Sequence, residues 1–275
     1  MQSGGLNLPA FPATVRLSRR TVLTGWLLMS MARAAQAQTT PEEELKIGLD
    51  PDYPPYTYYD DQHQLTGLDP ALAREACGRI GVNPVFVPIA WDKKNEWLAK
   101  GAIDCIWSCF SIDGREDHYL WVPYLYSRQV VVVPQSSDIQ RVADLKERPV
   151  AVQASTKPEN YFMQDPKAPR LEELISLPTT AEAFTALKNS YVEAVAGHEA
   201  VLLQLIHEVP GAYRMLDEPL QTVKVGVAFP LSFKRLDLIN RLKNALNRMA
   251  AEGEVARLAS AFGLEGEKVA MMPAD

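Results

Sequence analysis

The chain of 275 residues contains 28 basic and 34 acidic residues, and after residue 37 its basic residues do not form clusters. Such a chain lacks the positive surface that nucleic acids and anionic lipids require, so we expect neither as a partner. The spacing of Cys77, Cys105 and Cys109 matches neither a disulfide framework nor a zinc site. We expect no metal or cofactor, and we favour three buried thiols over a single disulfide bridge.

The first 37 residues have the composition of an export signal. A basic segment at 16–20 precedes an apolar run at 21–31, and small residues end at Ala37. Arg19 and Arg20 resemble the twin-arginine address. We predict cleavage near Ala37 and a periplasmic mature chain with 24 basic and 34 acidic residues, because the signal holds four arginines. No later apolar run is long enough to span a membrane.

From residue 45 onward, short apolar runs alternate with helix-like stretches, which predicts an α/β fold with mostly parallel strands. A first helix is expected to open with Asp69 as its N-cap and Pro70 in its first turn. The predicted strands cover 45–49, 85–88, 103–107, 129–133, 150–153, 173–177, 192–196, 213–216 and 224–229. The other predicted helices cover 93–100, 157–164, 181–189, 199–207, 236–249 and 254–262. No repeat or long linker separates these elements, so we expect two closely apposed lobes with a binding cleft between them.

Three segments have a more specific pattern. Residues 47–56 and 67–69 read Ile-Gly-Leu-Asp-Pro-Asp-Tyr-Pro-Pro-Tyr and Gly-Leu-Asp, residues 101–117 contain the Asp-Gly-Arg that ends at Arg115, and residues 150–156 end in Ala-Ser-Thr. In this order they resemble the bacterial extracellular solute-binding proteins of family 3, the receptors of polar amino-acid ABC importers. The resemblance covers nearly all of residues 45–264.

This resemblance implies a two-lobed fold of the type II periplasmic binding class. Two crossing strands near 126–131 and 224–227 would join the lobes, and the ligand would lie in the cleft between them. We expect lobe 1 at 38–126 and 225–275, and lobe 2 at 127–224. The expected role is that of a monomer that captures a small carboxylate-bearing solute and delivers it to an ABC permease in the inner membrane.

Arg115 is the predicted partner of the ligand carboxylate, because a guanidinium group meets both carboxylate oxygens at once. Its alternative fate is a solvated ion pair with Glu116 or Asp117. We expect other donors for the same ligand group from the residues that precede Arg115 and from the start of a helix in lobe 2. These donors are Ser108, Cys109, Phe110, Ser111, Ser155 and Thr156.

Aromatic residues are expected to form the apolar walls of the site. Tyr53, Tyr56 and Trp91 offer large rigid surfaces for a carbon skeleton, although core or hinge packing is an alternative that is most open for Trp91. Asp50 would accept a hydrogen bond from a ligand amine or a distal polar group. Its alternative role is to cap the proline-rich turn that follows it.

His198 departs from the family pattern. The resemblance implies an aspartate at this position to bind the ligand's α-ammonium, but the chain has His198 followed by Glu199. Either Glu199 replaces the aspartate, or the ligand is not an ordinary α-amino acid, unless His198 is only a surface loop residue. A protonated imidazole would favour a second carboxylate, and such binding would strengthen as pH falls through about 6.5.

Two other functions remain open at the level of sequence. The fold resembles that of a periplasmic cyclohexadienyl dehydratase, in which His198, Glu199 or His118 could act as general acid. We expect no catalytic residues, because the chain has no Gly-x-Ser-x-Gly motif, phosphate loop, metal-spaced histidine pair or dinucleotide fingerprint. The second alternative is a ligand-sensing subunit for a separate membrane sensor or an exported oxidoreductase.

Overall fold

The computed structural model describes residues 43–270. The predicted signal peptide at 1–37 and its cleavage site lie outside the described residues. Within residues 43–270, no helix is both long and apolar enough to cross a membrane.

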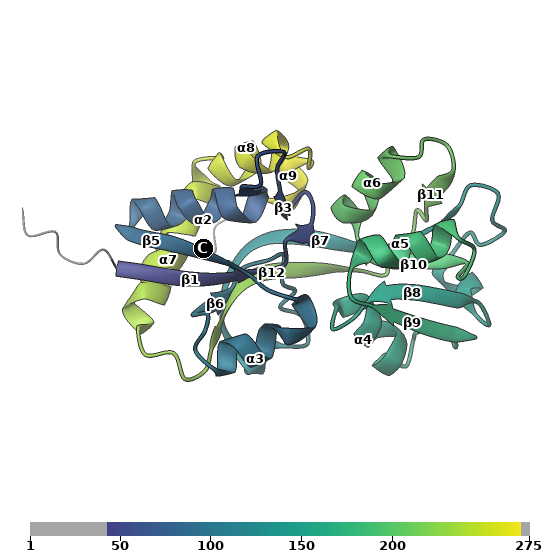
Figure 1. The fold of residues 1–275 in the computed structure, drawn as a ribbon, viewed down its shortest axis with the longest axis horizontal. Coiled ribbons are helices and arrows are strands. Elements are labelled where there is room, and N and C mark those ends of the chain that lie inside the picture. Colours follow the sequence, from purple (N-terminus) through teal and green to yellow (C-terminus); the bar gives the residue numbers. More distant parts are fainter. Residues whose placement is uncertain (1–42, 271–275) are drawn as a thin grey trace, which may run out of the picture. The chain divides into compact units, whose positions relative to one another are not determined.

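The described residues form two α/β lobes around one main sheet (Figure 1). Its strand order is β5-β1-β6-β12-β7-β10-β8-β9, and β11 also pairs with β7. The strands of this sheet are β1 (Glu43–Leu49), β5 (Val82–Pro88), β6 (Cys105–Ile106), β7 (Tyr119–Pro134), β8 (Pro149–Gln153), β9 (Glu173–Leu177), β10 (Ala194–His198), β11 (Tyr213–Met215) and β12 (Gln221–Pro230). A small separate sheet contains β2 (Asp52–Tyr53), β3 (Thr57–Tyr59) and β4 (Leu65–Thr66).

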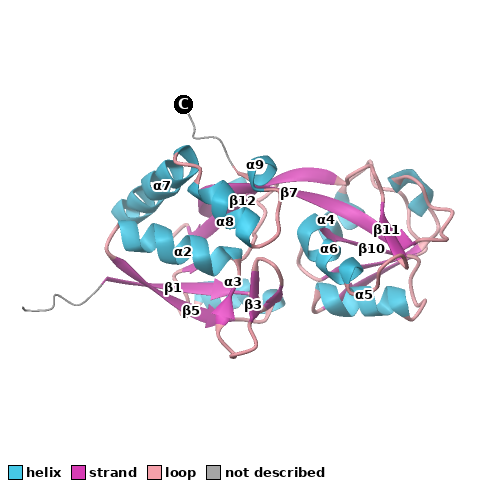
Figure 2. Cartoon of the chain, turned by 90° about the horizontal axis from the view of Figure 1, so that it is seen from above, coloured by secondary structure: helices cyan, strands magenta, loops and turns pink. Residues whose placement is uncertain are grey.

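Helices cover the sheet in both lobes (Figure 2). They are α2 (Leu68–Arg79), α3 (Lys94–Ala99), α4 (Lys157–Gln164), α5 (Thr180–Lys188), α6 (Glu199–His207), α7 (Leu236–Ala251), α8 (Glu254–Ala261) and α9 (Gly266–Val269). Short 3₁₀ helices span Trp91–Lys93, Glu116–His118 and Val142–Leu145. The start of α5 follows from its sequence, because Thr179 and Glu182 form a capping box in which each side chain accepts a hydrogen bond from the other's backbone N–H.

The sheet is mixed, and the prediction of mostly parallel strands is wrong in this respect. Pairs β1–β5, β1–β6, β8–β9 and β10–β8 are parallel, whereas β7 is antiparallel to β10, β11 and β12. The reason is that β7 and β12 run in opposite directions from one lobe into the other (Figures 1 and 2). The predicted crossing segments 126–131 and 224–227 lie within these two strands. The lobe boundaries themselves remain a prediction.

Each lobe has its own core. In lobe 1, the apolar side chains of β1 pack with those of α2 and α7, including Leu45, Leu72 and Leu242. The buried residues of α7 follow a spacing of three to four, which explains why this segment forms an amphipathic helix. In lobe 2, helices α5 and α6 pack on one face of β8 and β10, and α4 packs on the other. The C-terminal helices therefore complete the core that the N-terminal strands begin.

Several predicted elements differ from the structure. The predicted strand 129–133 is only the end of the 16-residue β7, and the predicted strand 103–107 shortens to β6. Gly67 occupies the N-cap of α2, so Asp69 is its second residue and its carboxylate caps nothing there. The prediction of three buried thiols is confirmed, because Cys77, Cys105 and Cys109 are all buried and unpaired.

Candidate functional site

A cavity with about 300 Å³ of free space lies between the two lobes, where the carboxyl ends of β1, β8 and β10 meet. Ligands bind α/β proteins at such strand ends. The lining residues are Asp50, Tyr53, Trp91, Ser108, Cys109, Phe110, Ser111, Arg115, Gln153, Ser155, Thr156, Lys157 and His198. Eleven of the thirteen predicted ligand-binding residues line this cavity, and Tyr56 and Glu199 do not.

Arg115 contributes a cation to the cavity. Its Nη1 donates to the backbone oxygen of Ser111 at 3.1 Å, and its guanidinium carbon lies 5.0 Å from the ring centroid of Phe110. Within the part of the chain that the structure describes, Arg115 forms no ion pair, so the alternative pairing with Glu116 or Asp117 is not formed. Partial burial lowers the pKa of Arg115 from its usual value without making the group neutral.

The backbone around Arg115 is attached to β12. Ile112 N–H donates to the oxygen of Lys224 at 2.8 Å, and Lys224 N–H donates to Asp113 Oδ2 at 2.7 Å. Ser111 forms a further antiparallel bridge with Val225. These backbone bonds fix the position of the segment from 108 to 115 within lobe 1.

Asp50 caps the turn as its sequence suggests, and it also accepts a hydrogen bond from lobe 2. Its Oδ1 accepts from Asp52 N–H at 3.1 Å, which caps the turn, and its Oδ2 accepts from Gln153 Nε2 at 2.8 Å. Asp50 N–H also donates to Ser108 Oγ at 3.0 Å. Burial raises the pKa of Asp50, although the hydrogen bond from Gln153 opposes this effect.

His198 is the last residue of β10 and is only 5% exposed, so it is not a surface loop residue. Its Nδ1 lies 2.7 Å from Ser127 Oγ, and the amide nitrogen of Gln129 lies 2.9 Å away. Burial lowers its pKa from 6.5 to about 3, and the charge of Arg115 adds to this effect. The imidazole is therefore neutral near pH 7. The expectation that a protonated His198 attracts a second carboxylate is not supported.

Tyr56 and Glu199 lie beside a second recess, which is lined by α6, the segment between α8 and α9, α9 itself and parts of β7 and β12. Glu199 Oε1 pairs there with Arg128 Nη1 at 3.0 Å. The Tyr56 hydroxyl lies 3.3 Å from Ser127 Oγ. Glu199 therefore does not supply an acid to the first cavity. It does not take the place of the aspartate that the family resemblance implies there.

Sequence reasoning missed Gln153, Lys157 and Lys94. Gln153 lies within the matched segment 150–156 and Lys157 follows it directly, so the polar residues on either side of Ala154-Ser155-Thr156 were the available signal. Lys94 lies behind the cavity wall and is 3% exposed. Its Nζ donates to the backbone oxygens of Trp91 at 3.2 Å and Ser155 at 3.4 Å. Burial lowers the pKa of Lys94 to about 8, and Arg115 contributes further.

The chemistry of the cavity suits binding better than nucleophilic catalysis. Cys109 Sγ lies 3.7 Å from His198 Nδ1, but burial raises the pKa of the thiol well above its usual value while it lowers that of the imidazole. A neutral thiol beside a neutral imidazole is not an activated nucleophile. Among residues 43–270, no group of three or more His, Cys, Asp or Glu side chains could hold a metal ion.

Two lobes that share two long strands, with a polar cavity between them, define a solute-binding protein of the periplasmic type II class. The model of the bacterial extracellular solute-binding proteins, family 3, matches residues 45–265, and the chain belongs to this family. The family resemblance and the fold class predicted from sequence are thus confirmed.

The curated relatives include amino-acid-binding proteins. The histidine-binding periplasmic protein of Salmonella typhimurium is 30% identical over 89% of this chain and 96% of its own length. The L-cystine-binding protein TcyJ of Escherichia coli is 24% identical over 82% of this chain and 84% of its own length. The chain therefore aligns with nearly the whole of these binding proteins.

Solved structures share the fold. An ABC uptake transporter substrate binding protein from Streptococcus pneumoniae with bound histidine has a TM-score of 0.75 at 23% identity, covering 83% of this chain and 94% of its own. An ancestral arginine-binding protein bound to arginine has a TM-score of 0.73 at 25% identity, covering 80% of this chain and 98% of its own.

Proposed function

We propose that the protein is a periplasmic receptor that captures a small carboxylate-bearing solute and delivers it to an ABC permease. The observation that carries this proposal is Arg115, a cavity-lining cation without an acidic partner among the described residues. A ligand carboxylate would give this guanidinium a two-point partner, and the serines at 108 and 111 add donors beside it. Relatives that bind histidine, cystine or arginine support an amino acid or a related organic acid as the solute.

The charge balance of the site favours an acid without an α-ammonium group. Arg115 and Lys157 line the cavity and Lys94 is buried behind its wall, so three cations surround it, whereas Asp50 is the one carboxylate among the described residues that line it. His198 is neutral and stands where the family resemblance implies an aspartate. A buried ammonium without a carboxylate partner is costly, so a zwitterionic or cationic amino acid would have only Asp50 to compensate it.

A solute screen tests this function. Thermal unfolding would be measured with L-histidine, L-arginine, L-cystine, succinate and benzoate, because a ligand at 100 times its Kd stabilises the fold by about 2.7 kcal/mol. We expect succinate or benzoate to stabilise the protein more than the amino acids. Stabilisation by L-arginine or L-histidine alone would retain the receptor function and exclude this ligand class.

Substitution of Arg115 separates binding from folding. Arg115→Ala is expected to abolish stabilisation by the solute and to leave the unfolding of the free protein unchanged, and Arg115→Lys should rescue binding poorly. Arg141→Ala is the matched control, because Arg141 is exposed and remote from the cavity. Near-normal affinity of Arg115→Ala would overturn the proposed carboxylate site.

Export to the periplasm is part of the same proposal. Changing both Arg19 and Arg20 to Lys should block export if the twin-arginine route is used, and mass spectrometry of the mature protein should find Gln38 at its N-terminus. Delivery to a permease predicts that deleting the gene reduces uptake of the solute. A ligand-sensing subunit would leave that uptake unchanged.

A further inference from the structure

Asp69 is a carboxylate at 0% exposure that does not line the cavity. Its Oδ2 accepts from Cys109 N–H at 2.7 Å, and its Oδ1 accepts from the Tyr124 hydroxyl, also at 2.7 Å. Asp69 forms no ion pair within residues 43–270. The position of Asp69 in the first turn of α2 provides the favourable field of a helix N-terminus, which does not by itself explain why a carboxylate is buried here.

The residue that Asp69 holds has an unusual backbone conformation. Cys109 has φ of 46°, in the left-handed region that residues other than glycine seldom adopt. Its N–H points to Asp69 and also lies 3.2 Å from the Tyr124 hydroxyl oxygen. The surrounding contacts must therefore compensate for a conformation that costs free energy.

Cys109 stands between the residues that line the cavity's anion-binding face. Ser108, before it, accepts from Asp50 N–H, and Phe110, after it, lies against the guanidinium of Arg115 at 5.0 Å. Rotation of the Cys109 backbone would move both neighbours. The hydrogen bond from Cys109 to Asp69 thus fixes the geometry of residues that Asp69 does not touch.

We propose that Asp69 is a positioning residue of the cleft, whose ionised carboxylate holds Cys109 in its left-handed conformation and thereby sets the affinity for the solute. The part that concerns solute affinity rests on the proposed function. Protonation of Oδ2 would remove the acceptor of the Cys109 N–H, and protonation of Oδ1, which could then donate to the Tyr124 hydroxyl, would leave Cys109 bonded to a neutral and weaker acceptor.

The carboxylate is suited to titrate near neutral pH. Burial raises the pKa of Asp69 to about 7, and the bonds from Tyr124 and Cys109 limit the rise. The titratable groups that face it are Tyr124 and Cys109 in contact, with Tyr53 and Tyr56 nearby, and burial raises the pKa of each well above its usual value. All four are neutral near pH 7. Lowering the pH from 8 to 6 should therefore protonate Asp69 and weaken solute capture.

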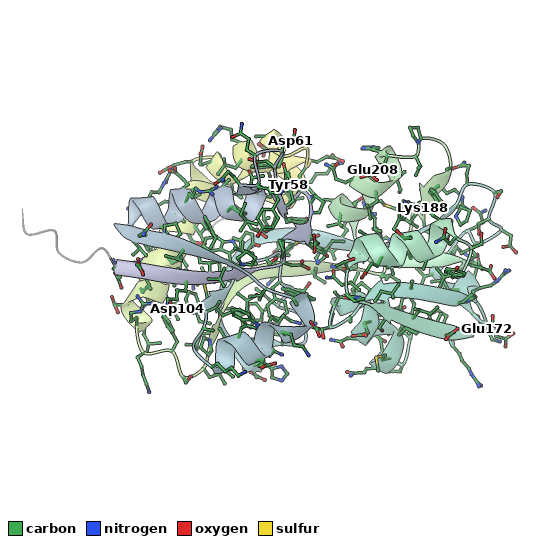
Figure 3. The ribbon with its side chains drawn as sticks, viewed as in Figure 1. Tyr58, Asp61, Asp104, Glu172, Lys188 and Glu208 are labelled. Atoms are coloured by element: carbon green, nitrogen blue, oxygen red, sulfur yellow. The ribbon has the colours of Figure 1, made fainter. Side chains whose placement is uncertain are left out.

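A ligand-free experiment tests the positioning. Protein labelled with [¹⁵N]cysteine gives three amide resonances, because the chain has three cysteines, and Cys109→Ser identifies the one from Cys109. We expect this resonance to titrate with a midpoint near pH 7 in the wild-type protein and not in Asp69→Asn. Asp61→Asn is the control, because Asp61 is exposed in the turn between β3 and β4 (Figure 3). A Cys109 resonance that titrates unchanged in Asp69→Asn would overturn the proposal.

Affinity for succinate, measured by calorimetry from pH 6 to 8, tests the functional consequence. Wild-type affinity should fall by up to about tenfold as pH is lowered, since one group with a pKa near 7 is about one-tenth ionised at pH 6. Asp69→Asn should bind at pH 8 about as weakly as wild type does at pH 6 and should not lose affinity as pH is lowered; Lys94, with a pKa of about 8, titrates in both proteins, so the ratio of their affinities isolates Asp69. Wild-type affinity and pH dependence retained in Asp69→Asn would contradict the proposal.

The role of Asp69 can still be tested if Asp69→Asn does not fold or if wild type does not bind succinate. Should Asp69→Asn fail to fold, Tyr124→Phe removes one of the two hydrogen bonds and should shift the Cys109 titration to higher pH, because that bond favours the ionised carboxylate. An unshifted midpoint would overturn the proposal. Should wild type not bind succinate at all, the proposed ligand class fails, and the Cys109 resonance still decides the role of Asp69.

Discussion

Gln153 Nε2 lies 2.8 Å from Asp50 Oδ2, and this hydrogen bond joins the strand ends of the two lobes across the cavity. The same amide nitrogen lies 3.1 Å from the oxygen of Pro178, and its oxygen accepts from Thr180 Oγ1 at 3.0 Å. The Gln153 side chain is thereby fixed within lobe 2 while it contacts Asp50 of lobe 1. Separation of the two lobes would break this bond.

Replacing Gln153 should weaken closure. Gln153→Leu leaves Oδ2 of the buried Asp50 without its hydrogen-bond donor, which costs about 1–3 kcal/mol. We expect solute affinity to fall about tenfold or more in calorimetry, which corresponds to about 1.4 kcal/mol. Gln164→Leu at the exposed end of α4 is the control and should bind normally. Equal affinities of the two variants would show that the bond does not contribute to the bound state.

His198 should affect stability in acid. Its pKa is about 3 in the folded protein and near 6.5 in the unfolded chain, so the unfolded state binds more protons between these values. Its contribution to the free energy of unfolding is therefore present above about pH 6.5 and is lost as pH falls, by up to about 1.4 kcal/mol per pH unit.

Urea unfolding of the wild type and His198→Gln at pH 4 to 7 measures this contribution. Asp69 has the opposite sign, because its raised pKa makes stability fall as pH rises from about 4 to about 7. The effects of His198 and Asp69 oppose each other in the wild type. The contribution of His198 is therefore given by the difference in the free energy of unfolding between wild type and His198→Gln. A difference that does not change with pH would show that the imidazole is not buried as described.

Lys94 should affect stability in alkali. Burial lowers its pKa to about 8 in the folded protein, against 10.5 for a free side chain. The unfolded chain binds more protons between these values, so stability should rise with pH in this range, by up to about 1.4 kcal/mol per unit. Lys94→Met should lack this rise in urea unfolding between pH 8 and 10. Lys100→Met, at the exposed end of α3, should retain it.

Gly226 lies in β12 at the shift in register opposite Pro123 of β7. A Cβ at this position would come within 2.9 Å of Ile112 Cδ1 and 3.1 Å of the backbone oxygen of Val122. Gly226→Ala should therefore destabilise the protein by about 1–3 kcal/mol. Gly78→Ala is the control in urea unfolding, because no atom lies within 4 Å of its added Cβ in α2, where alanine is favoured. Equal stability of the two variants would contradict the close approach.

Elements with clear local signals could be predicted from sequence, and β7 could not. Helices α4 and α6 and strand β9 have the predicted bounds, because a proline follows within three residues of the end of each. β7 contains Pro123 and the polar segment from 126 to 128, which interrupt its apolar pattern. Its length depends on pairing with β12, β10 and β11, and these contacts lie far apart in sequence.

The site could be predicted where neighbouring residues share a motif, and not where the chain turns. Tyr56 follows Tyr53 by three residues but lies in the turn before β3, so it contacts Ser127 and not the cavity. Glu199 begins α6 immediately after His198 ends β10, and the change from strand to helix directs the two side chains to different recesses. The role of Asp69 depends on a contact 40 residues away, which no local pattern indicates.

The attachment of the segment from 108 to 115 to β12 has a consequence for how such receptors diversify. Ile112 and Lys224 hold this segment through backbone groups, and Asp113 supports it from outside the cavity lining. The side chains that face the solute are thus largely separate from the bonds that maintain the loop. Mutation can exchange a solute-facing residue at little cost to the fold, so a change such as aspartate to histidine at a cleft position can alter ligand preference while the scaffold is inherited intact.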